Sequence, residues 1–209
     1  MNEELEKALY SISNNQVPKS WQKRAYPSLK PLASWVEDFI ERVKFFKAAV
    51  NEKPKMYWIS AFFFPQGFLT SVLQIHARKL KVPIDSLSFA YTFKQNLFKD
   101  CTDGAPTEGC LIYGLYSEAC CVDLKSSIVK ESAPDVIDTE VPVIHFKPIQ
   151  QKGEQNGQFC EIPLYKTKLR AGTLSTTGHS TNFIISITCK TDQEEAYWIK
   201  RGAAFFCSL

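Results

Sequence analysis

The sequence predicts an α+β fold in which N-terminal helices pack on a C-terminal antiparallel β-barrel. Upstream of Pro83, apolar residues recur every three or four positions, which is the period of one helix face. Downstream of Pro83 the period becomes two, and short apolar runs alternate with turn residues, as in a barrel or sandwich. We therefore expect a helical lobe at 1–83, the end of a longer helical region, and a β-barrel lobe at 84–209 that ends at the natural C-terminus.

The composition excludes several classes of protein. With 209 residues, 44% hydrophobic and 22% charged, the protein is globular and long enough to fold without a disulfide or metal. Its longest apolar stretch, 56–69, is too short and interrupted to span a bilayer, and the acidic N-terminus is unlike a signal peptide. A net charge of +3 is too small to indicate nucleic-acid binding. Seven cysteines without a Cys-x-x-Cys pair indicate reduced thiols in a reducing compartment, so we expect a soluble protein with no membrane or nucleic-acid partner.

Three helical segments are predicted in the first lobe. Residues 3–13 form the first, and a proline-rich connector separates it from a second helix that opens at Pro31 and ends at Lys53-Pro54. Asp38 and Arg42 are spaced to form an i,i+4 ion pair, which we place on the solvent side of that helix. Its apolar face comprises Trp35, Phe39, Val43, Phe46 and Val50.

The aromatic run 57–64 is predicted to be a buried strand or turn that leads into a third helix, from Pro65 to Pro83. The apolar stripe of that helix comprises Leu69, Val72, Leu73, His76 and Leu80.

Strands are predicted throughout the second lobe. Residues 87–93 and 183–189 alternate apolar with other side chains, which indicates half-buried strands. Further candidate strands are 110–116, 119–124, 141–147, 159–166 and 197–207.

Two motifs come close to catalytic signatures and fail. The segment 104–109 has the Gly-x4-Gly spacing of a phosphate loop, but Cys110 and Leu111 stand where Lys and Ser/Thr are required, and no helix is predicted to follow. The segment 178–182 resembles a nucleophile elbow, but Asn182 replaces the closing glycine and a strand is predicted next. We expect no catalytic residue, no metal site and no cofactor in this protein.

The three histidines are the remaining candidates for chemistry. His76 lies on an apolar helix stripe and His145 within a strand, so both are interpreted as core residues, whereas His179 lies in a polar loop. A Cys–His nucleophilic pair stays open as an alternative, because residues that are neighbours only in space are invisible in sequence.

Two groups of residues are candidates for an interface. The first is a basic cluster interleaved with Trp21 and Tyr26, for which the alternative is a solvated connector. The second belongs to the aromatic run, for which the alternative is the core between helices and barrel. The interface candidates are Lys19, Lys23, Arg24, Lys30, Phe62 and Phe63.

Long strings of the sequence resemble the C-terminal domain of dynein heavy chains, in order and over nearly the whole length. The longest are YPSLKPL at 26–32, WISAFFFPQGFLT at 58–70, PLYKT at 163–167, TLSTTGHSTNF at 173–183 and WIKRGAA at 198–204. The string STTGHSTN at 175–182 is similar to axonemal members, especially the single-headed inner-arm type, rather than to the cytoplasmic motor.

The resemblance implies a function that spacing alone does not. In that family this domain follows the sixth AAA+ module, lies across one face of the motor ring and is non-catalytic. It braces the ring and modulates a microtubule motor of the cilium or flagellum, within the axoneme and cytoskeleton. ATP and Mg²⁺ are bound by AAA+ modules elsewhere in the parent protein, and microtubules by a stalk, so the implied direct partners are the ring modules of the same dynein heavy chain. An alternative is an adaptor that recruits an axonemal subunit.

The sequence departs from the family at 118–123. The family usually has EGARWD there and this sequence has EACCVD, which removes an Arg-Trp pair. We therefore assign to this protein none of the contacts that the family makes through that segment.

Overall fold

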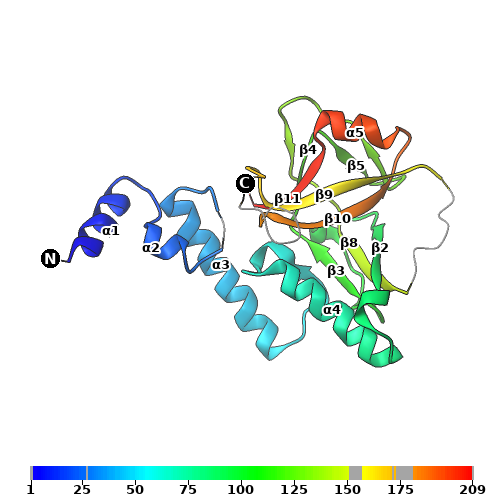
Figure 1. The fold of residues 1–209 in the computed structure, drawn as a ribbon, viewed down its shortest axis with the longest axis horizontal. Helices are drawn as coiled ribbons and strands as arrows, with labels where there is room; N and C mark the ends of the chain where they lie inside the picture. The colour runs from blue at the N-terminus through cyan, green and yellow to red at the C-terminus, as the bar shows by residue number, and fades with distance from the viewer. Residues whose placement is uncertain (1, 27, 151–156, 171, 173–180, 209) are drawn as a thin grey trace.

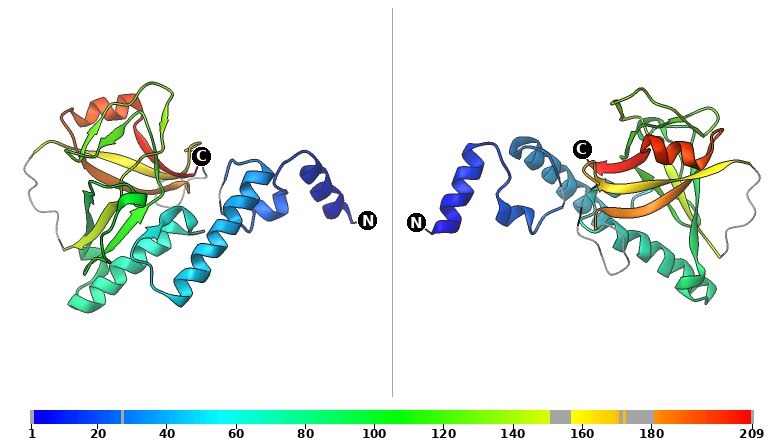
Figure 2. Two further views of the ribbon diagram at one scale, coloured as in Figure 1. Left: turned by 180° about the vertical axis from the view of Figure 1, so that it is seen from behind. Right: turned by 45° about the horizontal axis from the view of Figure 1, so that its top comes forward.

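The computed structural model describes residues 2–26, 28–150, 157–170, 172 and 181–208. Its N-terminal helices form an arm that projects from a body of strands (Figure 1), and α1 and α2 lie away from that body in both further views (Figure 2). We call α1–α3 the arm and the segment from β1 to β11 the body. Within the described residues no helix is long and apolar enough to cross a membrane.

The arm consists of α1 (Glu3–Ser13), α2 (Lys19–Gln22) and α3 (Leu32–Asn51). Asn2 caps α1 by accepting a hydrogen bond from the Glu4 N–H (3.2 Å), and Pro31 precedes α3 as predicted. The predicted apolar face of α3 is only partly correct. Trp35 is buried, but Val43 is 50% exposed and Val50 86% exposed, and the second buried residue of the helix is Arg42.

The aromatic run begins the body. β1 (Tyr57–Trp58) and a 3₁₀ turn, η1 (Ile59–Ala61), lead directly into α4 (Pro65–Leu80), as predicted. Leu69 and His76 of the predicted stripe are buried, whereas Leu80 is exposed. In Figure 1, α4 lies along one side of the strands.

The strands of the body form three sheets in the described residues. One has the order β1-β3-β8-β2, a second β10-β9-β11-β4-β7, and β5 pairs with β6. The remaining elements are two 3₁₀ turns, one helix and the strands. They are η2 (Ile84–Ser86), β2 (Ser88–Phe93), η3 (Phe98–Asp100), β3 (Cys110–Tyr113), β4 (Tyr116–Glu118), β5 (Cys121–Asp123), β6 (Ile128–Lys130), β7 (Ile137–Asp138), β8 (Ile144–Ile149), β9 (Phe159–Thr167), β10 (Phe183–Lys190), α5 (Glu195–Arg201) and β11 (Ala204–Ser208).

The prediction of a β-barrel is wrong, although the α+β class and the order of helices and strands are correct. A barrel requires an unbroken hydrogen-bonded ladder around its circumference. In the described part of the protein, β2 and β10 each end a different sheet and are not paired with each other. β11 inserts between β9 and β4 and runs parallel to β9, a pairing between distant segments that alternation along the sequence does not reveal.

The predicted strand at 197–207 is also wrong in its first part, which is the helix α5. The apolar run Tyr197–Ile199 is too short for its period to distinguish helix from strand. Trp198 anchors the helix because its buried indole N–H donates to Thr191 Oγ1 (2.9 Å).

One core unites the body. Ile59 and Leu69 pack with Phe89, Phe146 and Phe205, so residues on both sides of Pro83 contribute to it. The division into lobes at 1–83 and 84–209 stays a prediction. A separate small cluster in the arm comprises Val17, Tyr26 and Trp35.

Candidate functional site

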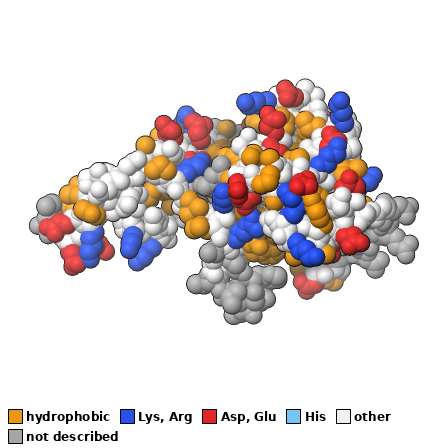
Figure 3. All heavy atoms as spheres, turned by 90° about the horizontal axis from the view of Figure 1, so that it is seen from above, with side chains coloured by type: hydrophobic (Ala, Val, Ile, Leu, Met, Phe, Trp, Pro, Cys, Tyr) orange, Lys and Arg blue, Asp and Glu red, His pale blue; other side chains and the backbone are white. Residues whose placement is uncertain are grey.

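The arm exposes many apolar side chains. α1 has no buried residue, although Leu5, Leu9 and Tyr10 all lie on it. Exposed aliphatic residues continue along α3 at Val36, Ile40 and Val43. Figure 3 shows hydrophobic side chains along the arm, next to lysines and arginines. Apolar surface of this extent is typical of a face that contacts another protein segment.

The predicted basic cluster lies on this arm but does not act as one unit. Lys19, Lys23 and Arg24 are exposed at α2, and the first two line a groove of about 620 Å³ between α1 and α2. Lys30 instead points to Asp38, with Nζ 3.1 Å from Oδ1. The structure therefore leaves three of the four cations available at the surface.

The two phenylalanine candidates face different surroundings. Phe62 is partly buried and stacks on Phe68, with ring centroids 4.3 Å apart, and its edge meets Phe46 of the arm at 5.4 Å. Phe63 is 42% exposed and packs edge-on against Tyr26 at 5.7 Å. Both residues thus lie where the arm meets the body, and only Phe63 offers a large exposed face.

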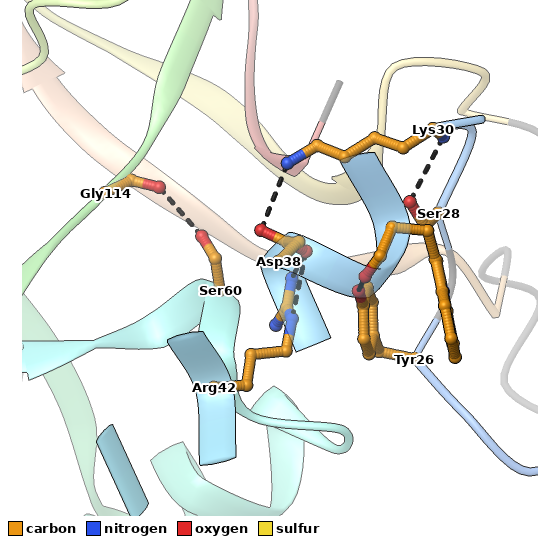
Figure 4. Close-up of polar contacts among 8 residues, drawn as sticks. Tyr26, Ser28, Lys30, Asp38, Arg42, Ser60 and Gly114 are labelled. Carbon is orange, nitrogen blue, oxygen red and sulfur yellow. Dashed lines mark hydrogen bonds and ion pairs between the residues drawn. The ribbon is translucent and has the colours of Figure 1, made fainter. Parts of the chain in front are cut away.

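Arg42 is the centre of the contact between arm and body. Its guanidinium is 3.6 Å from the Tyr26 ring centroid and 5.2 Å from that of Trp58, which belongs to β1. Nε and Nη2 donate to Asp38 Oδ2 at 3.1 and 2.9 Å (Figure 4). We call Tyr26, Lys30, Asp38, Arg42 and Trp58 the Arg42 junction.

The expected i,i+4 pair of Asp38 and Arg42 is confirmed, but its placement on the solvent side of the helix is wrong. The Arg42 side chain is 2% exposed. Cation–π contacts with Tyr26 and Trp58 offset part of the cost of burying the charge. The sequence does contain a signal for the burial of Arg42: the ion pair lies on the same helix as Trp35, and Tyr26 shortly precedes that helix.

Electrostatics stabilise the charged form of Asp38. Burial by itself raises the pKa of the Asp38 carboxyl, but Arg42 and Lys30 together hold that pKa below its ordinary value. Burial, followed by the charge of Asp38, raises the pKa of Tyr26 far above its ordinary value. The Tyr26 hydroxyl therefore stays protonated and donates to the Trp35 carbonyl at 3.0 Å.

The last strand completes the contact between arm and body. Tyr26 and Arg42 share a cavity of about 10 Å³ with Ser60, Lys166 and Cys207, which is room for about one water. Ser60 Oγ donates to the Gly114 carbonyl at 2.7 Å (Figure 4). Gly114 has φ +82°, and a Cβ there would lie 2.4 Å from Trp58 Cδ1, so close packing of Trp58 requires glycine.

The residues that were candidates for chemistry lie apart from this junction. His76 is buried in α4, and His145 Nε2 lies 2.8 Å from the Glu108 carbonyl oxygen. His179 and most of the segment 178–182 lie outside the described residues. Asn182 is buried, accepts from the Thr167 N–H at 3.0 Å and precedes β10, so a strand follows as predicted. The segment 104–109 leads into β3 without a helix, as predicted.

Four cysteine thiols in the body have a raised pKa, the opposite of what an activated nucleophile requires. Burial raises the pKa of Cys110, Cys120, Cys160 and Cys207 to about 12, which keeps these side chains protonated near neutral pH. All seven cysteines are free thiols. Across the described residues no group of three or more His, Cys, Asp or Glu side chains is arranged to hold a metal ion. In the divergent segment, Cys120 is buried and Cys121 begins β5.

Comparison with known proteins identifies what this protein is similar to. The family described as the C-terminal domain of the dynein heavy chain matches residues 1–207. The sequence is 44% identical to human dynein axonemal heavy chain 6 and to rat dynein axonemal heavy chain 1, and 42% identical to human dynein axonemal heavy chain 12. Each match covers 100% of this sequence but only 6%, 5% and 7% of the respective relative, so the 209 residues span a small part of those proteins.

Proposed function

The protein belongs to the family formed by the C-terminal domains of dynein heavy chains, and on that premise we propose that it is a non-catalytic brace of an axonemal motor. The domain holds AAA+ modules of its own heavy chain in fixed positions relative to one another, and it modulates a microtubule-based motor of the cilium or flagellum. The relatives described above are axonemal heavy chains, which favours the axoneme as its location.

The observation that carries this proposal is the arm. It combines an exposed apolar face on α1 and α3 with available cations on α2, and it is joined to a well-packed body at the Arg42 junction. A brace requires this division, because one part must contact a neighbour while the other stays rigid. In the proposed arrangement the arm contacts the ring modules, with Lys19, Lys23, Arg24 and Phe63 at or near the interface. Phe62 packs the arm against the body, and Lys30 pairs with Asp38 within the arm.

Catalysis is assigned to the rest of the parent protein. We place ATP and Mg²⁺ in the AAA+ modules and microtubule contact in another region of the heavy chain. The described thiols with raised pKa give no support to a cysteine hydrolase in this domain. Coupling would appear as a change in the ATPase rate of the ring when the domain binds or is removed.

The test is binding in trans. The 209-residue protein is added to a motor ring truncated before this domain, and complex formation and ATPase rate are measured together. We expect binding with an altered turnover rate, and we expect the double variant Leu9→Gln/Tyr10→Ser to weaken binding. Ile199→Gln, at an apolar position on α5 that is as exposed as Tyr10, is the control and should bind like the unchanged protein.

A folded protein that neither binds the ring nor changes its ATPase rate would overturn the proposal. Binding that Ile199→Gln weakens as much as the α1 variant does would place the interface on the body instead of the arm.

A further inference from the structure

A second surface, formed by α4 and the loop that precedes β3, has the properties of a ligand site. A groove of about 220 Å³ lies between these two elements. Its lining includes residues just before β1, residues of α4 and the segment 105–110. We call it the α4 groove.

The floor of the α4 groove is apolar and already formed. The rings of Tyr57 and Phe68 contact each other with centroids 5.0 Å apart, and both line the groove together with Val72. Ile75 is 69% exposed, although it lies on a helix whose other face is packed in the core. An exposed isoleucine above an aromatic floor favours an apolar side chain as ligand.

The edges of the groove are basic. Lys53, Lys55 and Lys79 line it, and none of them has an ion pair or hydrogen bond with another side chain in the described part of the protein. Glu108 is the acidic residue of the lining, and its carboxylate lies 3.6 Å from Lys147 Nζ. Three such ammonium groups around an apolar floor complement a ligand that is both acidic and apolar.

The wall opposite α4 is held in place. His145 Nε2 lies 2.8 Å from the Glu108 carbonyl oxygen, which ties the loop to β8. Gly109 has φ +75°, and a Cβ there would lie 2.0 Å from the Phe146 carbonyl oxygen, so the backbone is pressed against the same strand. A fixed wall reduces the ordering cost of binding.

The groove does not fit a nucleotide. The wall contains residues 105–109 of the segment 104–109, whose spacing resembles a phosphate loop, but Pro106 removes a backbone N–H and a strand follows rather than a helix. The volume is also below the range of about 300–1,000 Å³ that small-molecule sites occupy. It is sufficient for one large side chain of a peptide.

We propose that the α4 groove binds an acidic peptide segment of a partner protein, anchored by one aromatic or large aliphatic side chain. The anchor lies on Tyr57, Phe68 and Ile75, and the flanking carboxylates pair with Lys53, Lys55 and Lys79. This site is separate from the arm and goes beyond the proposed bracing of the ring.

The test uses labelled peptides and the 209-residue protein, with fluorescence anisotropy at low salt. The probe has several Asp and Glu residues on either side of one Phe, and matched peptides replace the Phe by Ala or the acids by Gln. We expect a Kd on the order of 10–100 µM for the probe, and at least about tenfold weaker binding for either matched peptide. Raising the salt concentration should weaken binding of the probe.

Variants of the protein locate the site. Lys55→Gln/Lys79→Gln and Ile75→Gln should each weaken binding about tenfold or more. The controls are Lys125→Gln/Lys200→Gln, which makes the same charge change outside the groove, and Ile199→Gln, whose original side chain is as exposed as Ile75. Circular dichroism checks that each variant is folded.

Several results would overturn the inference. These are no binding of the probe, equal binding of the Ala-anchored peptide, or equal losses in groove and control variants. Concentration-dependent self-association that Ile75→Gln abolishes would assign the groove to a second copy of the protein. Loss of ring binding in the groove variants would make the α4 groove part of the contact with the ring. The α1 variant Leu9→Gln/Tyr10→Ser should bind the peptide normally. The peptide proposal and the bracing proposal can therefore fail independently of each other.

Discussion

The arm and the body differ in how much of their apolar surface they bury themselves. In the body, Ile162, Leu164, Phe146 and Phe205 are fully buried in one continuous core. Among the described residues of the arm, the buried apolar ones are Val17, Tyr26 and Trp35, and α1 buries none. The body is therefore stabilised by its own core, whereas the arm depends on the Arg42 junction and leaves many apolar side chains exposed. Under the proposed bracing function, this difference would keep the rigid part of the domain distinct from the part that contacts the ring.

The largest effect is expected in the body. Leu164→Ala removes a fully buried side chain from β9 and should lower the free energy of unfolding by about 4 kcal/mol, since the neighbouring strands cannot close the cavity. Urea denaturation followed by circular dichroism measures it. A loss below about 1 kcal/mol would contradict the view that the body core provides most of the stability.

The next largest loss of stability is expected at the Arg42 junction. Arg42→Met leaves the Asp38 carboxylate, which is 10% exposed, without its main partner and should destabilise the contact between arm and body by about 3 kcal/mol. Cys207 and Cys189 both belong to the body core, and of the two Cys207 also lines the junction cavity, so labelling resolved by residue distinguishes opening of the junction from opening of the core. In the Arg42→Met variant, the labelling rate should rise at Cys207 and stay unchanged at Cys189.

The double variant Arg42→Met/Asp38→Asn is the control for this prediction. Removing both charges should cost less than the sum of the single changes. Equal acceleration at both thiols in Arg42→Met would mean that arm and body unfold together.

A smaller loss of stability is expected when the pH is lowered. The pKa of Asp38 in the folded protein is below its ordinary value, so its contribution to stability is present above the unfolded pKa of about 3.9 and is lost as the pH falls through the folded pKa. Acid should therefore loosen the junction before it affects the core. Tryptophan fluorescence during urea unfolding, compared between the unchanged protein and Asp38→Asn at several pH values, measures this. The two proteins should converge as the pH falls, and a constant difference would exclude Asp38 as the titrating group.

The smallest effect is expected at the tip of the arm. Leu9→Ala should change the free energy of unfolding by no more than about 0.5 kcal/mol, because the side chain is 49% exposed and α1 has no buried residue. The same substitution at Leu164 is the internal comparison. A large loss at Leu9 would show that α1 is packed against the rest of the protein in solution.

Local patterns predicted most of the elements correctly. Pro31 and Pro65 mark the starts of α3 and α4, because proline is tolerated in the first turn, and the alternation at 87–93 coincides with β2. The short strands β6 and β7 and the helices α2 and α5 were not predicted, since segments this short show no clear period; α2 lies in the segment predicted to be a proline-rich connector. Of the candidate site, the cations of α2 and the ion pair of Asp38 and Arg42 were visible in the sequence.

What the sequence by itself determined is the family, the helix-then-strand order and the i,i+4 pairing, all of which depend on residues close together in sequence or on long matching strings. Only the tertiary structure decided which strands pair, that the sheets do not close into a barrel within the described residues, and that Arg42 is buried rather than exposed. The α4 groove likewise exists only because folding brings Lys53, Lys79 and the loop before β3 together. The physical reason is common to all four. Burial and strand pairing depend on contacts between distant segments, whereas a period of two or of 3.6 indicates which side of an element is apolar but not which segment packs against it.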